Sequence, residues 1–204
     1  MTVFAVNKED LEASYQSARA EAIILLEKVN AVQQRLAATN FVGETAEGLA
    51  IEMNDKMGIF VDNSYTNVDL VMKLIVDRMN VVVTKLGGNL WGYQTIERGA
   101  HAQAEAKETS GNAIYTIDTE DMAQFAKDVD AWFDEIAQCY QNIRNTIAEG
   151  TPSWQGPEKI TTVNDVTEAV STILGGVGGT GVLGVGSSLS TLLRDQVTLM
   201  EAAG

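Results

Sequence analysis

The chain has 204 residues, of which 14 are basic and 28 are acidic, and its net charge is −14. This balance disfavours binding to bare nucleic acid, because each phosphate contact requires a Lys or Arg, and it disfavours a polybasic membrane-surface domain. A single Cys and a single His exclude an intrachain disulfide and metal sites built from several Cys or His residues. A hydrophobic share of 45% with only two prolines predicts a globular core made from long helices.

The first ten residues contain neither a basic segment nor a long apolar segment, so they do not form a secretory signal peptide. We expect a protein that is made in the cytoplasm. If it is secreted or displayed at the cell surface, it leaves the cell by a signal-peptide-independent route.

A long amphipathic helix is predicted after Asn7, which is a suitable N-cap, with Glu9 and Asp10 near the positive end of the helix dipole. Its apolar residues alternate spacings of four and three and so form a heptad seam. The seam consists of Leu11, Tyr15, Ala18, Ala22, Leu25, Val29, Val32 and Leu36. A turn with the sequence Phe41-Val42-Gly43 follows, in which Gly43 permits a chain reversal.

A second helix is predicted at roughly residues 45–86, where apolar residues again lie close to heptad spacing, and Gly87-Gly88 ends it as a C-cap. Residues 1–110 therefore form a first unit, a hairpin of two long antiparallel helices with a tail. The polar segment from Gly87 to Asn112 is expected to form either a helical tail or a flexible tether.

The chain then repeats itself at an offset of 111 residues. Residues 3–11 and 114–122 agree in residue type at most positions, with Asp118 in the place of the first N-cap. The second seam consists of Met122, Ala126, Val129, Phe133, Ile136, Tyr140, Ile143 and Ile147, and a turn follows at Trp154-Gln155-Gly156. Residues 111–204 therefore form a second helical hairpin with a Gly-rich C-terminal part. Because one hairpin alone leaves an apolar face exposed, we predict an all-α fold in which two tandem helix-turn-helix hairpins pack as an elongated four-helix bundle.

Seven glycines lie within the 12 residues from Gly175 to Gly186 and interrupt the last helical region. Each Gly costs about 1 kcal/mol relative to Ala in a helix, so this segment is expected to be a break or a tightly packed small-residue contact. The uncharged segment 169–193 is long enough to span a bilayer, although Gly, Ser and Thr make it barely apolar. The candidate residues for an assembly contact or a membrane segment are Gly175, Gly178, Gly179, Gly181 and Gly184.

The order of these features resembles the WXG family, the small substrates of type VII secretion. Trp154-Gln155-Gly156 matches the family's Trp-x-Gly turn, and Phe41-Val42-Gly43 is a variant with Phe in place of Trp. Tyr93 and Glu97 match the family's tail motif, Tyr-x-x-x-Asp/Glu, about 50 residues after the first turn. The chain departs from the family because this tail motif lies in the linker between the two units rather than near the C-terminus.

The resemblance implies a dimer of hairpins fused into one chain. It also implies a composite export signal, in which Tyr93 and Glu97 of the first unit meet the turn from Trp154 to Gly156 of the second. The implied partners are proteins: a membrane-bound secretion ATPase and, in addition, a cognate secreted protein or a second copy of the chain. The implied function is that of a binding or carrier module, without catalysis and without a cofactor. Two alternatives remain open, namely a self-assembling structural protein and a membrane-inserting secreted factor that uses residues 169–193.

Other sites are not supported by the pattern. Residues 176–181 fit Gly-x-Gly-x-x-Gly, but the chain has no room for the second strand that a dinucleotide site requires. We expect His101 to face solvent and Cys139 to be a buried structural thiol beside the second seam.

Overall fold

The computed structural model describes residues 6–39, 41–89, 91–98, 106–107, 115–116, 118–151, 153–176 and 181–203, and these form five helices and three very short strands. The helices are α1 (Lys8–Ala38), α2 (Glu44–Lys85), α3 (Thr119–Glu149), α4 (Pro157–Gly175) and α5 (Val182–Ala203). The strands are β1 (Phe41–Gly43), β2 (Ala106–Lys107) and β3 (Tyr115–Thr116). The prediction of a helical, bundle-like fold is confirmed.

Both predicted N-caps are present. The Asn7 side chain accepts a hydrogen bond from the backbone N–H of Glu9, and the Asp118 side chain accepts one from Asp121. Each cap therefore satisfies a backbone donor that the first helical turn leaves without a partner. The two related sequences thus begin their long helices in the same way.

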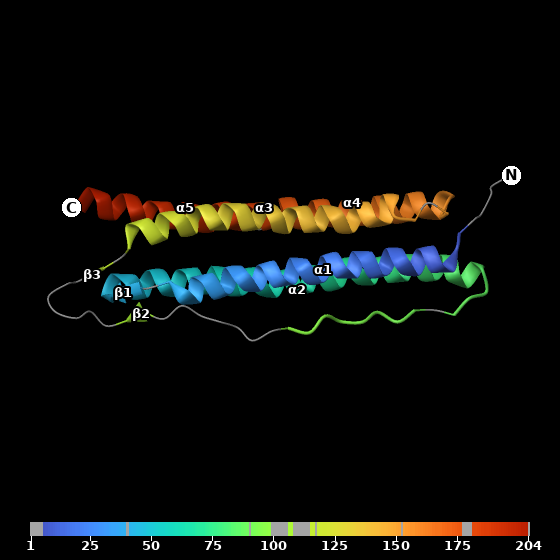
Figure 1. Cartoon of the computed structure of the whole chain (residues 1–204), viewed down its shortest axis with the longest axis horizontal. Helices are drawn as coiled ribbons and strands as arrows, with labels where there is room; N and C mark the ends of the chain where they lie inside the picture. The colour runs from blue at the N-terminus through green and yellow to red at the C-terminus, as the bar shows by residue number, and fades with distance from the viewer. Residues whose placement is uncertain are drawn as a thin grey trace.

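The helices run roughly parallel or antiparallel to one long axis (Figure 1). α2 returns along α1, while α4 and α5 follow one another back along α3. α1 packs most extensively against α3, and α2 packs against α1 on one side and against α4 on the other. The short strands lie at one end of the bundle, where β1 pairs in parallel with β2 and antiparallel with β3.

All sixteen residues of the two predicted seams are buried, and they join one continuous core. The core also contains Phe125 and Cys139, while Trp132 is partly buried against it. Phe60 of α2 is buried and lies against Phe133 of α3, with ring centroids 4.6 Å apart. The aliphatic stripes of the two halves therefore bury one another, which is the main source of stability for an amphipathic helix.

Ion pairs join the two halves on the outside of this core. Lys28 contacts Glu135 and Arg35 contacts Asp121, each at 2.5 Å, and Arg78 pairs with Asp165. All these groups are partly exposed to solvent, so each pair contributes at most about 1 kcal/mol. The pairs fit the register that the core sets and add little to its stability.

The Gly-rich segment interrupts the helical structure over fewer residues than the sequence predicts. α4 ends at Gly175 and α5 already begins at Val182, so Gly184 and Gly186 lie inside a helix. Gly186 is buried, and an added Cβ there would collide with the ring of Phe133 on α3. The absence of a side chain thus permits the close approach of α5 to α3, and this contact offsets the low helix propensity of glycine.

The other candidate glycines have different environments. Gly181 is buried beside the end of α4, Gly184 is partly buried, and an added Cβ on the exposed Gly175 would touch nothing. Gly178 and Gly179 lie outside the described residues.

Candidate functional site

The turn between α3 and α4 lies at the end of the bundle where α1 begins. The backbone N–H of Asn7 donates to Ser153 Oγ at 3.2 Å, and the hydroxyls of Ser14 and Thr151 share a buried hydrogen bond of 2.5 Å. Gly156 precedes α4 with a φ of 118°, a conformation that side chains disfavour. The turn is therefore fastened to the start of α1 rather than projecting freely.

Trp154 is buried in this turn. Its side chain is only 1% exposed, its backbone N–H donates to the carbonyl of Thr151 at 3.1 Å, and its indole Nε1 has no hydrogen-bond partner among the described residues. The indole is thus part of the core. Among the described residues around this turn, Gln155 and Pro157 are exposed to solvent.

The turn between α1 and α2 lies at the opposite end of the bundle, about 46 Å away along the 31 residues of α1. Phe41 and Gly43 are the ends of strand β1 there. Phe41 pairs with Ala106, and Gly43 pairs with Tyr115. The two predicted turns are therefore not brought together.

Residues 91–98, called the strap from here on, contain the predicted tail motif. The strap is neither a helix nor a free tether, because it is bound to α2 at several points. It runs along the side of the α1–α2 pair that faces away from α3 (Figure 1). At its start, Asn80 of α2 makes two hydrogen bonds of 2.9 Å with the backbone of Trp91. Its Nδ2 donates to the Trp91 carbonyl, and its Oδ1 accepts from the Trp91 N–H.

Tyr93 is fixed at the middle of the strap. Its hydroxyl donates to a carboxylate oxygen of Asp69, and Lys73 Nζ lies 5.4 Å from the centre of its ring. Burial is the main cause that raises the pKa of Tyr93 above its usual value, and the hydrogen bond with Asp69 raises it further. Tyr15 and Arg19 of α1 are close enough to influence the same hydroxyl.

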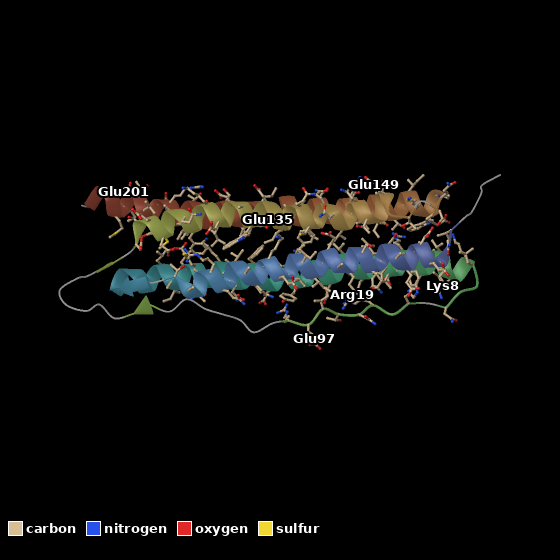
Figure 2. The ribbon with its side chains drawn as sticks, in the orientation of Figure 1. Lys8, Arg19, Glu97, Glu135, Glu149 and Glu201 are labelled. Atoms are coloured by element: carbon tan, nitrogen blue, oxygen red, sulfur yellow. The ribbon has the colours of Figure 1, made fainter. Side chains whose placement is uncertain are left out.

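The end of the strap is held by Arg98, whose Nη1 lies 2.7 Å from Asp62 and whose guanidinium lies 5.3 Å from the centre of the Tyr65 ring. Glu97 makes no such contact and is exposed, with its side chain directed away from the bundle (Figure 2). The two residues of the tail motif therefore differ in their environment, since Tyr93 is bound to Asp69 whereas Glu97 is exposed to solvent and accessible to a partner.

The expected meeting of the tail motif with the Trp154 turn does not occur in this structure. Lys85, at the end of α2, forms a 2.5 Å ion pair with Glu158 beside that turn. Asp69, which holds Tyr93, lies about 24 Å back along α2 from Lys85. The tail begins at the turn but then folds back along α2, because Asn80, Asp69 and Asp62 bind it there.

These three α2 residues were missed by sequence reasoning. They occupy polar positions beside the seam of the second predicted helix, where a solvated face is the ordinary interpretation. The sequence contains one indication of the strap, which is the presence of three large apolar residues, Trp91, Tyr93 and Ile96, in an otherwise polar segment. In the structure these three residues are partly buried against the core, while their neighbours are exposed.

Hollows on the described surface lie beside both the second turn and the strap. A hollow of about 130 Å³ is lined by residues of α2 and α4: Arg78, Val81, Pro157, Glu158, Thr161 and Thr162. An open hollow of about 500 Å³ lies on α2 and adjoins the strap, since Asp69 and Lys73, which contact Tyr93, belong to its lining. The lining consists of Thr66, Asp69, Leu70, Lys73, Leu74 and Asp77. The described residues contain no group of three or more His, Cys, Asp or Glu side chains that could hold a metal ion.

Comparison of the chain with models of protein families, with curated proteins and with solved structures finds no match. The resemblance to the WXG family thus rests on the residues quoted above. Cys139 is buried as expected, and burial raises the pKa of its thiol. His101 lies outside the described residues.

Proposed function

We propose that the chain is a tandem WXG-like protein, a binding or carrier module without catalysis that is exported by a type VII secretion machine. In this proposal residues 1–110 and 111–204 are two hairpin units fused into one bundle. The observation that carries it is the mutual burial of the two duplicated seams in one elongated core. A rigid rod of this kind suits a protein that presents short segments to a partner rather than one that encloses a substrate.

The start of the tail lies beside the second turn, which supports a composite export signal. The end of α2 and the turn containing Trp154 and Gly156 lie at the same end of the bundle, joined by the ion pair between Lys85 and Glu158. A secretion ATPase that binds this end would meet the start of the tail and the exposed part of the turn together. Glu97 is exposed and supplies a negative charge, but it lies beside Arg98 at the Asp62 end of the strap, so a reader of the turn meets it once the tail leaves α2.

The test is export from a bacterium that carries a type VII secretion machine. We expect the double variant Tyr93→Ala/Glu97→Ala to accumulate in the cells, while the matched control Gln94→Ala/Thr95→Ala, at exposed strap positions, is exported like the wild type. Both variants alter the strap and leave the core intact. Export of the Tyr93/Glu97 variant at the wild-type level would contradict the proposed signal.

Self-assembly remains a second candidate because α2 carries exposed apolar residues on its outer face. Ile59, Leu70 and Val81 are 63%, 53% and 46% exposed and follow one another at intervals of eleven residues, so they form a nearly straight stripe. A structural role predicts high-order species in native mass spectrometry that Leu70→Lys disperses. A carrier role predicts a chain that stays monomeric in the absence of its partner.

The membrane-inserting alternative would use residues 169–193, which are divided between α4 and α5. Among the residues that the structure describes, no helix combines the length and the apolar character needed to cross a bilayer.

A further inference from the structure

The surface under the strap has the features of a binding site for an extended peptide. It is formed by Asp62, Asp69, Lys73 and Asn80 of α2, with Tyr15 and Arg19 of α1 beside Tyr93. Its contacts with Tyr93 and Arg98 are made to the side chains of those two residues. The contact with Trp91 is different, because Asn80 binds both backbone polar groups of that residue.

Recognition of the backbone by Asn80 matters because an extended segment has no internal hydrogen bonds. The amide group of Asn carries N–H donors on its nitrogen and an acceptor oxygen, so it can bind both the C=O and the N–H of a single residue. Asn80 thereby takes the place that a neighbouring strand would have in a sheet. This contact fixes where an extended chain begins on α2.

The strap also fits the surface in length. Asp62 and Asn80 lie about 27 Å apart along α2, and the seven residue steps from Trp91 to Arg98 span about 23–25 Å when extended. The side chain of Arg98 covers the remainder to reach Asp62 at 2.7 Å. The three inward residues, Trp91, Tyr93 and Ile96, then rest on the core between these two ends.

The contact that holds the end of the strap on α2 is weak enough to be broken. Arg98 and Asp62 are 46% and 58% exposed, and exposed ion pairs are weak. On the α1 side, the hydroxyl of Tyr15 and Nε of Arg19 are buried without a hydrogen-bond partner among the described residues. The strap thus leaves hydrogen-bonding capacity of its own binding surface unused.

We propose that this surface is a peptide-binding site that the chain fills with its own residues 91–98, and that the strap is releasable. Its ligands are extended segments with the pattern aromatic-x-aromatic-x-x-aliphatic-x-basic. The strap contacts hold Tyr93 in a closed state. This inference rests on the proposed function in one respect, since Tyr93, which the closed state holds on α2, belongs to the motif proposed to be read in export.

Release of the strap would bring the tail motif within reach of the turn. The five residue steps from Gly88 to Tyr93 span about 17 Å when extended, and Gly88 is the third residue after the end of α2. The closed state therefore keeps Tyr93 away from the Trp154 turn, and the open state permits the composite signal. The strap acts as an autoinhibitory contact.

The direct test uses the whole chain with a weakened strap and a fluorescent synthetic peptide of residues 89–98. In the variant Trp91→Ala/Tyr93→Ala/Ile96→Ala the surface is freed, and we expect the peptide to bind it at least about tenfold more tightly than it binds the wild type, a difference of about 1.4 kcal/mol. Asn80→Ala in the same background is expected to weaken peptide binding by about the same factor. A peptide with Ala in place of its Trp, Tyr and Ile is expected not to bind.

Two results would overturn the proposal. One is that the peptide binds neither protein, and the other is that it binds both equally, because the strap would then not occupy the site. Circular dichroism of each variant checks that the bundle is folded. Since purified protein is used without a secretion machine, failure here is distinct from a failure of the export experiment.

Trypsin provides a second measurement that requires no peptide. Cleavage after Arg98 is expected to be slow in the wild type and at least about tenfold faster in Asn80→Ala, because proteolysis tracks the population of the open form. The exposed-site control Gln94→Ala is expected to be cleaved at the wild-type rate. Cleavage of wild type and Asn80→Ala at equal rates would contradict a strap held by Asn80.

Discussion

Substitution of Trp154 by Ala distinguishes a structural tryptophan from one that is displayed to a partner. The side chain is 1% exposed and is the largest of the fully buried side chains of the described residues. A buried Trp removes about 150–250 Å² from water, and at about 25 cal/mol per Å² this corresponds to about 4–6 kcal/mol. Measured losses for Trp to Ala in cores are about 3–5 kcal/mol, so we expect a loss of about 4 kcal/mol.

The assay is thermal and denaturant unfolding followed by circular dichroism. For a chain of this length, each kcal/mol shifts Tm by about 2–4 °C, so Trp154→Ala should lower Tm by about 8–16 °C. Trp154→Phe should cost much less, about 1.5 kcal/mol or below, because most of the apolar volume is kept and the unpartnered indole N–H is removed.

Trp91→Ala is the matched control, because Trp91 lies in the strap and is only partly buried. Its effect on global unfolding should stay below about 1 kcal/mol, as for other sites outside the core. If Trp154→Ala proved no more destabilising than Trp91→Ala, the indole would not be part of the core and the account of this turn would be refuted.

Two further predictions concern glycine and tyrosine. Gly58→Ala, in the interior of α2 with nothing within 4 Å of the added Cβ, should stabilise the chain by about 1 kcal/mol. Gly186→Ala should instead destabilise it because the new Cβ collides with Phe133, and urea unfolding that gave both changes the same sign would contradict the close contact of α5 with α3. Burial raises the pKa of Tyr140, and burial with the Asp69 hydrogen bond raises that of Tyr93, both above the usual 10.0. The protonated forms of these two phenols therefore contribute to the stability of the fold, and this contribution is fully present below pH 10. It is lost as the pH rises through the folded-state pKa values of the two side chains. Absorbance titration at 295 nm should show some tyrosines that ionise only above the usual pH, and Tyr93→Phe and Tyr140→Phe should each reduce that part of the signal.

The sequence was sufficient to predict the helices that carry the duplication. A heptad seam sustained over about four heptads has one interpretation, and every seam position from Leu11 to Leu36 and from Met122 to Ile147 is buried as expected. The caps at Asn7 and Asp118 were predictable because their hydrogen bonds are local. Long helices and their buried positions were therefore predictable wherever the heptad pattern extended over several turns.

The strap could not be predicted because its contacts depend on tertiary structure. Asn80, Asp69 and Asp62 are ordinary polar residues of a helix, and nothing in their spacing indicates that an extended segment binds them. The start of α5 was missed for a related reason. Gly184 and Gly186 oppose a helix by propensity, and only the close contact of Gly186 with Phe133 compensates.

The central claim is that the two duplicated halves pack against each other as one body within a single chain. Zero-length carbodiimide cross-linking of the monomeric fraction tests it, since this reagent joins only amines and carboxylates that are already in contact. If the halves pack in this way, intramolecular links are expected between Lys28 and Glu135 and between Lys85 and Glu158, each pair being 2.5 Å apart. Absence of both links from the folded monomer, or their appearance only between chains in a mixture of isotopically labelled and unlabelled protein, would contradict it.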